Sequence, residues 1–199
     1  MQTRKRDMSR RERRKSTPQT GYTQVLQGSR LSTARAVRVD MHAKHCFEVC
    51  RAVKGMQAGA AIAYLNEVLK IDSDRADIRK KARAIPYRLG SGNKRRRRSG
   101  PSMVGHRKGG IGPGRYPVKA SREIIKLIES AMSNASHQYE DINPEDMEIT
   151  HIAAHRGRIR KGWSPRARGR ATPKNHYQVN LEIFLEDFSS DDEMDGDEF

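Results

Sequence analysis

The chain has 199 residues, a net charge of +16 at neutral pH and an isoelectric point near 10.3. Only 35% of its residues are hydrophobic, which suffices for one modest domain with tails. A charge of this size favours a polyanionic partner. A membrane is disfavoured, because there is no apolar run of about 18 residues and no amphipathic helix with a basic face opposite large aromatics. Nucleic acid is the expected partner.

The first 28 residues form a basic segment containing Gly, Ser, Thr and Gln, which predicts an arm that is disordered until it is bound. Residues 1–15 lack the apolar core of a signal peptide. They are Arg-rich, as some transit peptides are, but Asp7, Glu12 and the lack of large apolar residues argue against that alternative.

Residues 33–39 have β character, and Asp40 is expected to cap the helix that follows. Apolar spacing then predicts three amphipathic helices. The first ends near Gly55 and carries Cys46, Val49, Cys50 and Val53. The second carries Ala58, Ala61, Ile62, Leu65, Val68 and Leu69. The third follows Pro117 and carries Ile124, Ile125, Leu127, Ile128, Ala131, Met132 and Ala135.

Two apolar-rich segments, residues 147–155 and 177–186, predict the strands of a hairpin. The second alternates at period two, with one face formed by Tyr177, Val179, Leu181, Ile183 and Leu185. The predicted fold is α+β: three helices packed on one face of a small antiparallel sheet of about three strands, with a long extended β-hairpin over residues 147–186.

Residues 71–115 show no clear periodicity, and a connection of this length in a compact domain is either functional or disordered. It contains KRRRR at residues 94–98 and GHRKGGIGPGRYP at residues 105–117. Glycine allows the backbone to approach a phosphate, and the basic side chains supply the opposite charge. The candidate RNA-binding residues here are Lys94, Arg95, Arg96, Arg97, Arg98, His106, Arg107 and Lys108. KRRRR also fits a nuclear localisation signal.

Between the two hairpin strands lie residues 156–175, RGRIRKGWSPRARGRATPKN, with eight Lys or Arg residues and no acid. We call this segment the arm. It repels itself and buries nothing, so it is either a solvated loop or an arm that a polyanion surrounds. At about 3.3 Å per residue it projects on the order of 30 Å. Trp163, the only tryptophan, is expected to stack on an unpaired base or to stand exposed in a tunnel or groove.

Cysteine and histidine side chains are the other candidates for chemistry. Cys46 and Cys50, one helical turn apart, are expected to be reduced thiols. With His42 they form a row that could hold a soft metal, although such rows are more often helix surface and core. His151, His155 and His176 flank the arm and could serve a nuclease, but the acids Glu182 and Glu186 lie on the return strand, so contact with RNA is the favoured interpretation. No cofactor, metal, enzymatic activity or small-molecule substrate is expected.

Three segments carry a family resemblance: KHCFEVCRAVKGM (44–56) with AIAYLNEVL (61–69), GRYPVKAS (114–121), and HIAAHRGRIRKGWSPRARGRATPKN (151–175). In order and spacing they resemble the universal large-subunit ribosomal protein L-twenty-two family, called L-seventeen in eukaryotes, in its archaeal-type form. The resemblance covers roughly residues 32–187. PRARGRATPKN (165–175) is its most specific part.

The resemblance implies a structural, cytoplasmic protein of the large ribosomal subunit whose body binds rRNA and whose hairpin lines the nascent-peptide exit tunnel. Its implied partners are large-subunit rRNA, neighbouring ribosomal proteins and the nascent polypeptide. The alternative is a free-standing basic RNA-binding protein or RNA chaperone. Residues implied or expected to bind rRNA are Arg115, Tyr116, Lys119, Arg156, Arg158, Arg160, Lys161, Trp163, Arg166, Arg168, Arg170 and Lys174. The implied tunnel-lining tip is Pro165, Arg166, Ala167, Arg168, Gly169 and Arg170.

The chain departs from the family pattern in several places. A Ser-Pro pair that usually opens the first helix is replaced by DMHAKH, and GGIGPGRYP lacks an aromatic often found before GRYP. Residues 91–103 resemble an insertion into the domain formed by residues 29–188. An acidic tail, residues 189–199, holds six acids and no base. It is expected to screen the basic surface, to contact a basic neighbour, or to be a solvated extension.

Overall fold

A three-stranded antiparallel sheet forms one layer of the protein. The computed structural model describes residues 21–24, 30–87, 105–106 and 113–188. Strand β1 is Leu31–Asp40, β5 is Glu148–Arg160 and β8 is His176–Glu186, and they pair in the order β1–β8–β5. The sequence-distant β1 and β5 therefore both pair with β8, the last strand.

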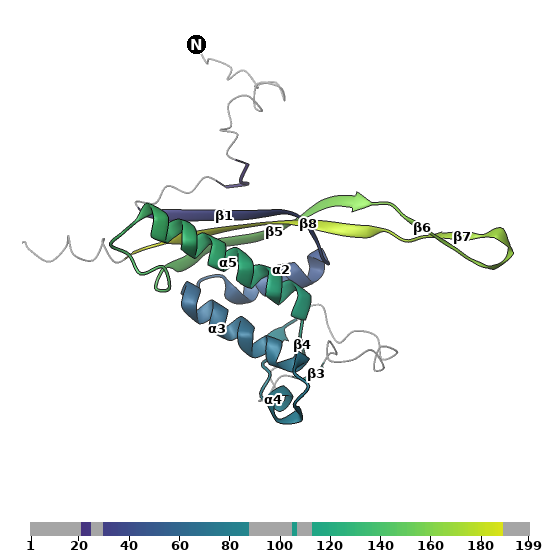
Figure 1. Ribbon diagram of the computed structural model, residues 1–199, viewed down its shortest axis with the longest axis horizontal. Coiled ribbons are helices and arrows are strands. Elements are labelled where there is room, and N and C mark those ends of the chain that lie inside the picture. The colour runs from purple at the N-terminus through teal and green to yellow at the C-terminus, as the bar shows by residue number, and fades with distance from the viewer. Residues whose placement is uncertain (1–20, 25–29, 88–104, 107–112, 189–199) are drawn as a thin grey trace, which may run out of the picture.

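Three long helices form the second layer and cover one face of this sheet (Figure 1). They are α2 (Ala43–Val53), α3 (Ala58–Leu69) and α5 (Val118–Gln138). One cluster of buried side chains from the helices and the inner sheet face makes the core. The predicted α+β fold is confirmed. Within the described residues, no helix is both long and apolar enough to cross a bilayer.

The helical stripes expected from apolar spacing are the buried faces. All four apolar residues predicted for the first helix are buried in α2. In the other two helices Ile62, Leu69 and Met132 are only partly buried at the edge of the core, whereas the rest of each stripe is buried. Gly55 follows α2 with φ +76°, a left-handed conformation that glycine adopts without a steric penalty.

The predicted role of Asp40 is wrong. Helix α2 begins at Ala43, and its N-cap residue is His42, which makes no side-chain capping bond. Asp40 instead ends β1 opposite Gln178, whose Nε2 donates to Asp40 Oδ1 at 3.2 Å. Asp40 therefore pairs with β8 through its backbone and its side chain, and it does not cap α2.

The stretch between the second and third helices contains more regular structure than its sequence suggests. After α3 come a 3-10 turn (Lys70–Asp72) and the short helix α4 (Ala76–Lys80). Strands β2 (Ile85–Pro86), β4 (Pro113–Arg115) and β3 (Gly105–His106) then form a second small antiparallel sheet in that order. These elements are too short to produce a readable period. The strand pairing nevertheless brings residue 85 next to Arg115.

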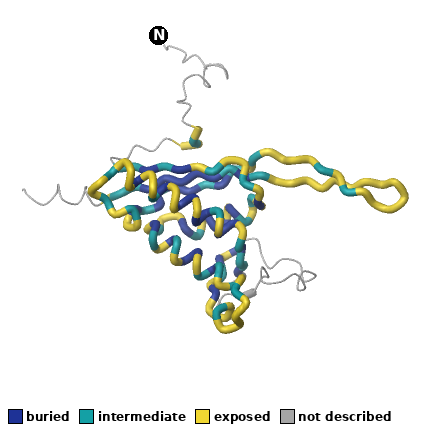
Figure 2. Tube along the Cα trace, viewed as in Figure 1, coloured by how far each residue is buried: buried dark blue, intermediate teal, exposed yellow. Residues whose placement is uncertain are grey.

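The hairpin is continuous with the main sheet. Strands β5 and β8 pair from Glu148 opposite Glu186 as far as Arg160 opposite His176. Beyond them, β6 (Trp163–Pro165) pairs with β7 (Ala171–Pro173). Figure 2 shows the change in burial along this ribbon, from buried within the body to exposed in the projecting part. Tyr177, on the predicted inner face of β8, lies past the edge of the core and is 48% exposed.

Candidate nucleic-acid interface

The arm is a two-stranded ribbon whose basic side chains face solvent. Those on the outgoing and return strands, Arg156, Arg158, Arg160, Lys161 and Lys174, are all exposed. Because residues 156–175 contain no acid, no internal pairing within the arm reduces its positive potential. An elongated surface of one charge sign attracts a polyanion, and each neutralised phosphate releases a counterion.

A tight turn closes the far end of the ribbon. The Arg166 backbone N–H donates to the Arg170 carbonyl at 2.7 Å, across a 3-10 turn at Ala167–Gly169. Arg168 and Gly169 both adopt positive φ, +60° and +68°. The structure therefore places residues 165–170 at the tip. Their predicted contact with a tunnel stays a prediction.

Trp163 stands on the ribbon opposite Pro173 and is 71% exposed. Next to it the two sides of the hairpin approach closely: the Lys174 backbone N–H donates to the Gly162 carbonyl at 2.6 Å. A Cβ at residue 162 would lie 2.7 Å from the Lys174 carbonyl oxygen, so glycine is needed for this approach. The exposed indole is therefore available for stacking.

A groove of about 520 Å³ lies at the root of the hairpin. It brings together Arg115, Tyr116 and Lys119, predicted from the segment before α5, with the predicted arm-flanking His176. His42 and His45, at the start of α2, line the same groove, which no local sequence pattern indicates. His42 stacks against Tyr177 with ring centroids 6.1 Å apart.

Arg115, which lines this groove, packs against an aromatic side chain. Its guanidinium carbon lies 5.0 Å from the centroid of the Tyr87 ring, a cation–π geometry. Its Nε is buried and has no hydrogen-bond partner among the described residues. The Tyr87 hydroxyl hydrogen-bonds His45 Nδ1. Burial raises the pKa of Tyr87, so this hydroxyl stays protonated.

The predicted sites in the segment of residues 88–112 are mostly outside the described residues. That holds for Lys94, Arg95, Arg96, Arg97, Arg98, Arg107 and Lys108. His106 contributes its backbone to β3, opposite Pro113. Their proposed contacts with RNA stay predictions.

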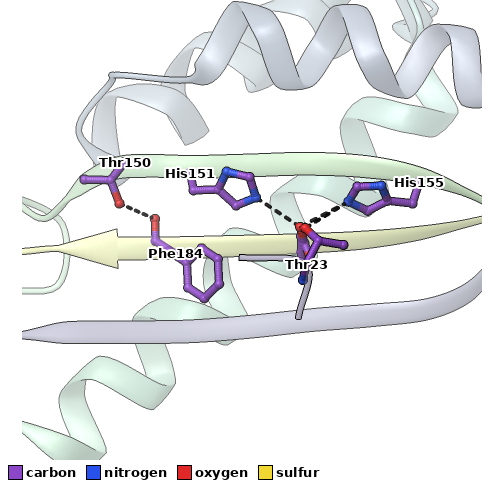
Figure 3. Close-up of polar contacts among 6 residues, drawn as sticks. Thr23, Thr150, His151, His155 and Phe184 are labelled. Atoms are coloured by element: carbon purple, nitrogen blue, oxygen red, sulfur yellow. Dashed lines mark hydrogen bonds and ion pairs between the residues drawn. The ribbon is translucent and has the colours of Figure 1, made fainter. Parts of the chain in front are cut away.

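The histidines and the return-strand acid lie together, contrary to the expectation that Glu182 would be out of reach. His151 Nε2 and His155 Nε2 lie 3.0 and 3.1 Å from Glu182 Oε1, and Thr23 donates to the same carboxylate through its hydroxyl and its backbone N–H (Figure 3). Antiparallel pairing places Ala153 opposite Glu182, so the two histidines flank the acid. His151 is only 9% exposed, which contradicts its predicted contact with RNA.

The hydrogen bonds of this cluster stabilise the buried Glu182 carboxylate, which is a structural role. Glu182 is 4% exposed, and a buried carboxylate requires donors. Burial raises the pKa of Glu182, but the hydrogen bonds from Thr23, His151 and His155 outweigh it and hold that pKa at about 2. His176 lies elsewhere, on the groove. The three histidines therefore do not form one site.

The cysteines are free and buried, as expected of reduced thiols. Burial raises the pKa of Cys46 to about 11, and burial together with neighbouring Cys46 raises that of Cys50. Both are therefore protonated and unreactive near neutral pH. His42 is exposed, and no group of three metal-binding side chains occurs among the described residues.

The family model described as ribosomal protein L22p/L17e matches residues 34–186. The chain belongs to this family. A protein named large ribosomal subunit protein uL22 from Methanococcoides burtonii is 38% identical over 164 residues, covering 82% of this chain and 94% of that protein. Its namesake from Methanocorpusculum labreanum is 38% identical over 166 residues, with 83% and 96% covered. The one from Methanococcus vannielii is 32% identical over 170 residues, with 84% and 97% covered.

These relatives confirm the predicted archaeal-type form of the family. Membership makes the chain a structural, non-enzymatic ribosomal protein, and the nuclease hypothesis is set aside on that ground. The matched region covers the helices, strand β1 from residue 34 onward, and the whole hairpin with β5 and β8.

Proposed function

We propose that this protein is a structural constituent of the large ribosomal subunit in the cytoplasm. In this proposal it binds large-subunit rRNA through the arm and through the basic segment before α5. Its hairpin lines the nascent-peptide exit tunnel, so its partners are rRNA, neighbouring large-subunit proteins and the nascent polypeptide. Family membership and the names of the archaeal relatives support the assignment to the large subunit.

The observation that carries the proposal is the exposed, acid-free ribbon on a body that does not need it for its core. The buried cluster ends in β8 at Val179, whereas residues 156–175 hold eight basic side chains. Moving these charged side chains out of water costs free energy unless phosphates replace the water around them. RNA supplies phosphates on several sides of an inserted strand pair.

The chemistry of the arm favours recognition of RNA shape over base sequence. Arg outnumbers Lys on it, and the guanidinium group can bind phosphate with two parallel bonds or stack on a base. Phosphate contacts fix position and register without reading sequence. Trp163 adds a stacking surface that accepts any base.

The alternative, a free-standing RNA-binding protein or RNA chaperone, would use the same basic surface. Sucrose-gradient fractionation after a high-salt wash separates the two. A ribosomal constituent co-sediments with large subunits in a one-to-one ratio. Recovery of the washed protein only at the top of the gradient would overturn the proposal and favour the alternative.

A matched variant tests the role of the arm in binding. Changing Arg156, Arg158 and Arg160 to Gln removes three exposed charges without touching the core. The variant should unfold at the same temperature as the parent and bind rRNA fragments more weakly at low salt. Unchanged affinity would show that these side chains are not part of the RNA-binding surface.

A further inference from the structure

The hairpin leaves the body where both neighbours of β8 carry a bulge. On β1, Ala36 pairs with Leu181 and Val39 with Val179, so two residues face the single residue Asn180. On β5, Arg156 pairs with Val179 and Ile159 with Tyr177, so two residues face only Gln178. A β-bulge bends its strand and increases the local twist. Two bulges therefore act on one short stretch of β8, from opposite sides.

Asn180 completes the bulge on β1. Arg38 in this bulge has φ +62°, in the left-handed region that side-chain-bearing residues rarely occupy. Its backbone N–H donates to Asn180 Oδ1 at 3.0 Å. The side-chain amide thus supplies the acceptor for a donor in the irregular part of the ladder.

Gly157 allows the bulge on β5 to lie against the same amide. A Cβ on residue 157 would lie 3.1 Å from the Gln178 carbonyl oxygen and 3.3 Å from Asn180 Oδ1. A side chain at this position would displace β5, the Gln178 carbonyl or the Asn180 amide by a few tenths of an ångström. The two bulges are therefore coupled through Asn180.

We propose that Asn180, with Gly157, is a positioning joint that fixes the direction in which the hairpin leaves the body. Strand β1 ends just past the joint at Asp40, and the ribbon continues as two strands (Figure 1). For a lever on the order of 30 Å, a change of about 10° moves the tip by about 5 Å. The consequence for assembly rests on the proposed function, because a ribbon that enters a passage in RNA must point into it.

Distance measurement on the RNA-free full chain tests the joint. Spin labels are placed at Ser130→Cys on α5 and Ala171→Cys near the tip, both exposed positions, while Cys46 and Cys50 are buried. The mean of the distance distribution reports direction, and its width reports flexibility. Asn180→Ala, Gly157→Ala and Gly157→Val should each shift the mean, by about 5 Å for a change in direction of about 10°. The conservative variant Asn180→Asp keeps an acceptor for the Arg38 backbone N–H and should therefore keep the parental mean.

Asn175→Ala is the matched control, since it removes an exposed amide near the same strand but away from both bulges. It should leave the mean unchanged. A parental mean in Asn180→Ala and Gly157→Ala, at parental unfolding temperature, would overturn the joint. Co-sedimentation with large subunits is scored separately: failure of the parent protein to co-sediment would overturn the proposed function and leave the joint standing.

Discussion

Glu182 is an acidic side chain in an apolar strand, between Leu181 and Ile183, and the sheet accommodates it on its outer face. There the carboxylate receives hydrogen bonds from the two histidines of β5 and from Thr23. Tyr22 packs against Phe184 at a centroid distance of 5.2 Å, so the segment that carries Thr23 also covers the neighbouring ring. The buried acid therefore ties the N-terminal side of the domain to its last strand.

Acid should weaken the folded state through this group. The pKa of Glu182 is lowered from its ordinary value of 4.5 to about 2, so its ionised form stabilises the fold fully above pH 4.5 and loses that contribution as pH falls towards 2. Glu182→Gln should cost about 2 kcal/mol of unfolding free energy at pH 7, and the difference from the parent should shrink over this acid range. Urea unfolding between pH 2 and 7 measures it. Glu129→Gln, an exposed position on α5, is the control, and a pH-independent difference at Glu182 would contradict the expectation.

Trp163 offers a second test at single-residue resolution. It is the only tryptophan and is 71% exposed, so its fluorescence reports directly on the arm. If its indole stacks on a base, rRNA fragments should reduce its accessibility to acrylamide, and Trp163→Ala should weaken binding by about 1–3 kcal/mol. Trp163→Phe keeps a stacking ring and should lose less. If the alanine and phenylalanine variants bind rRNA fragments with equal affinity, the ring at position 163 does not stack on a base.

At the scale of elements, the hairpin joins a half that is buried in the body to a half that is exposed to solvent. Strand β8 is buried at Val179 and from Leu181 to Leu185, whereas residues 156–177 are almost entirely exposed. Without RNA, amides in α5 and in β8 from Val179 to Leu185 should exchange slowly, and amides of residues 156–175 should exchange rapidly. Hydrogen exchange on the free protein and on an rRNA-fragment complex measures this. Slow exchange of the arm in the free protein would show that RNA is not what orders it.

The helices and the hairpin could be predicted because their signals are local and repeated. Four buried positions one turn apart fix α2, and alternation over many residues fixes β8. The capping prediction for Asp40 is wrong because the sequence around a helix cap resembles that at a strand end, and the partner residue Gln178 on β8 is 138 residues away. The Glu182 cluster and the root groove depend on such pairing between distant segments. A polar residue between Leu181 and Ile183 was the available signal for the cluster, and it was ambiguous.

At the scale of the whole molecule, charge should govern association with RNA. The chain carries a net charge of +16 and has only a modest core. The Lys and Arg side chains of the arm are exposed, and the arm contains no acidic residue. If about six to ten phosphates are neutralised, affinity for rRNA fragments should fall roughly 10³–10⁵-fold between about 50 and 200 mM salt. Filter binding across a salt series measures the slope. A nearly flat response would show that charge is not the main determinant of binding.

The tip tests the tunnel role separately from assembly. Arg166, Arg168 and Arg170 are exposed and lie beyond the last core residue of the hairpin. Changing all three to Gln should therefore leave the unfolding temperature of the body unchanged. Incorporation into large subunits should also survive, because the basic residues at the hairpin root and along Arg156–Arg160 remain.

What should change is the behaviour of nascent chains. Three positive charges on a tunnel wall attract or delay passing segments according to their charge, so their removal should alter stalling by particular sequences. The measurement is a stalling-peptide assay on purified variant ribosomes with normal subunit yield. Asn175→Ala, an exposed position between β7 and β8, keeps all three charges and is the matched control. Normal assembly with unchanged stalling would contradict a tunnel role for the tip. Loss of assembly from the tip changes alone would show that the tip, rather than the root and the body, anchors the protein in rRNA.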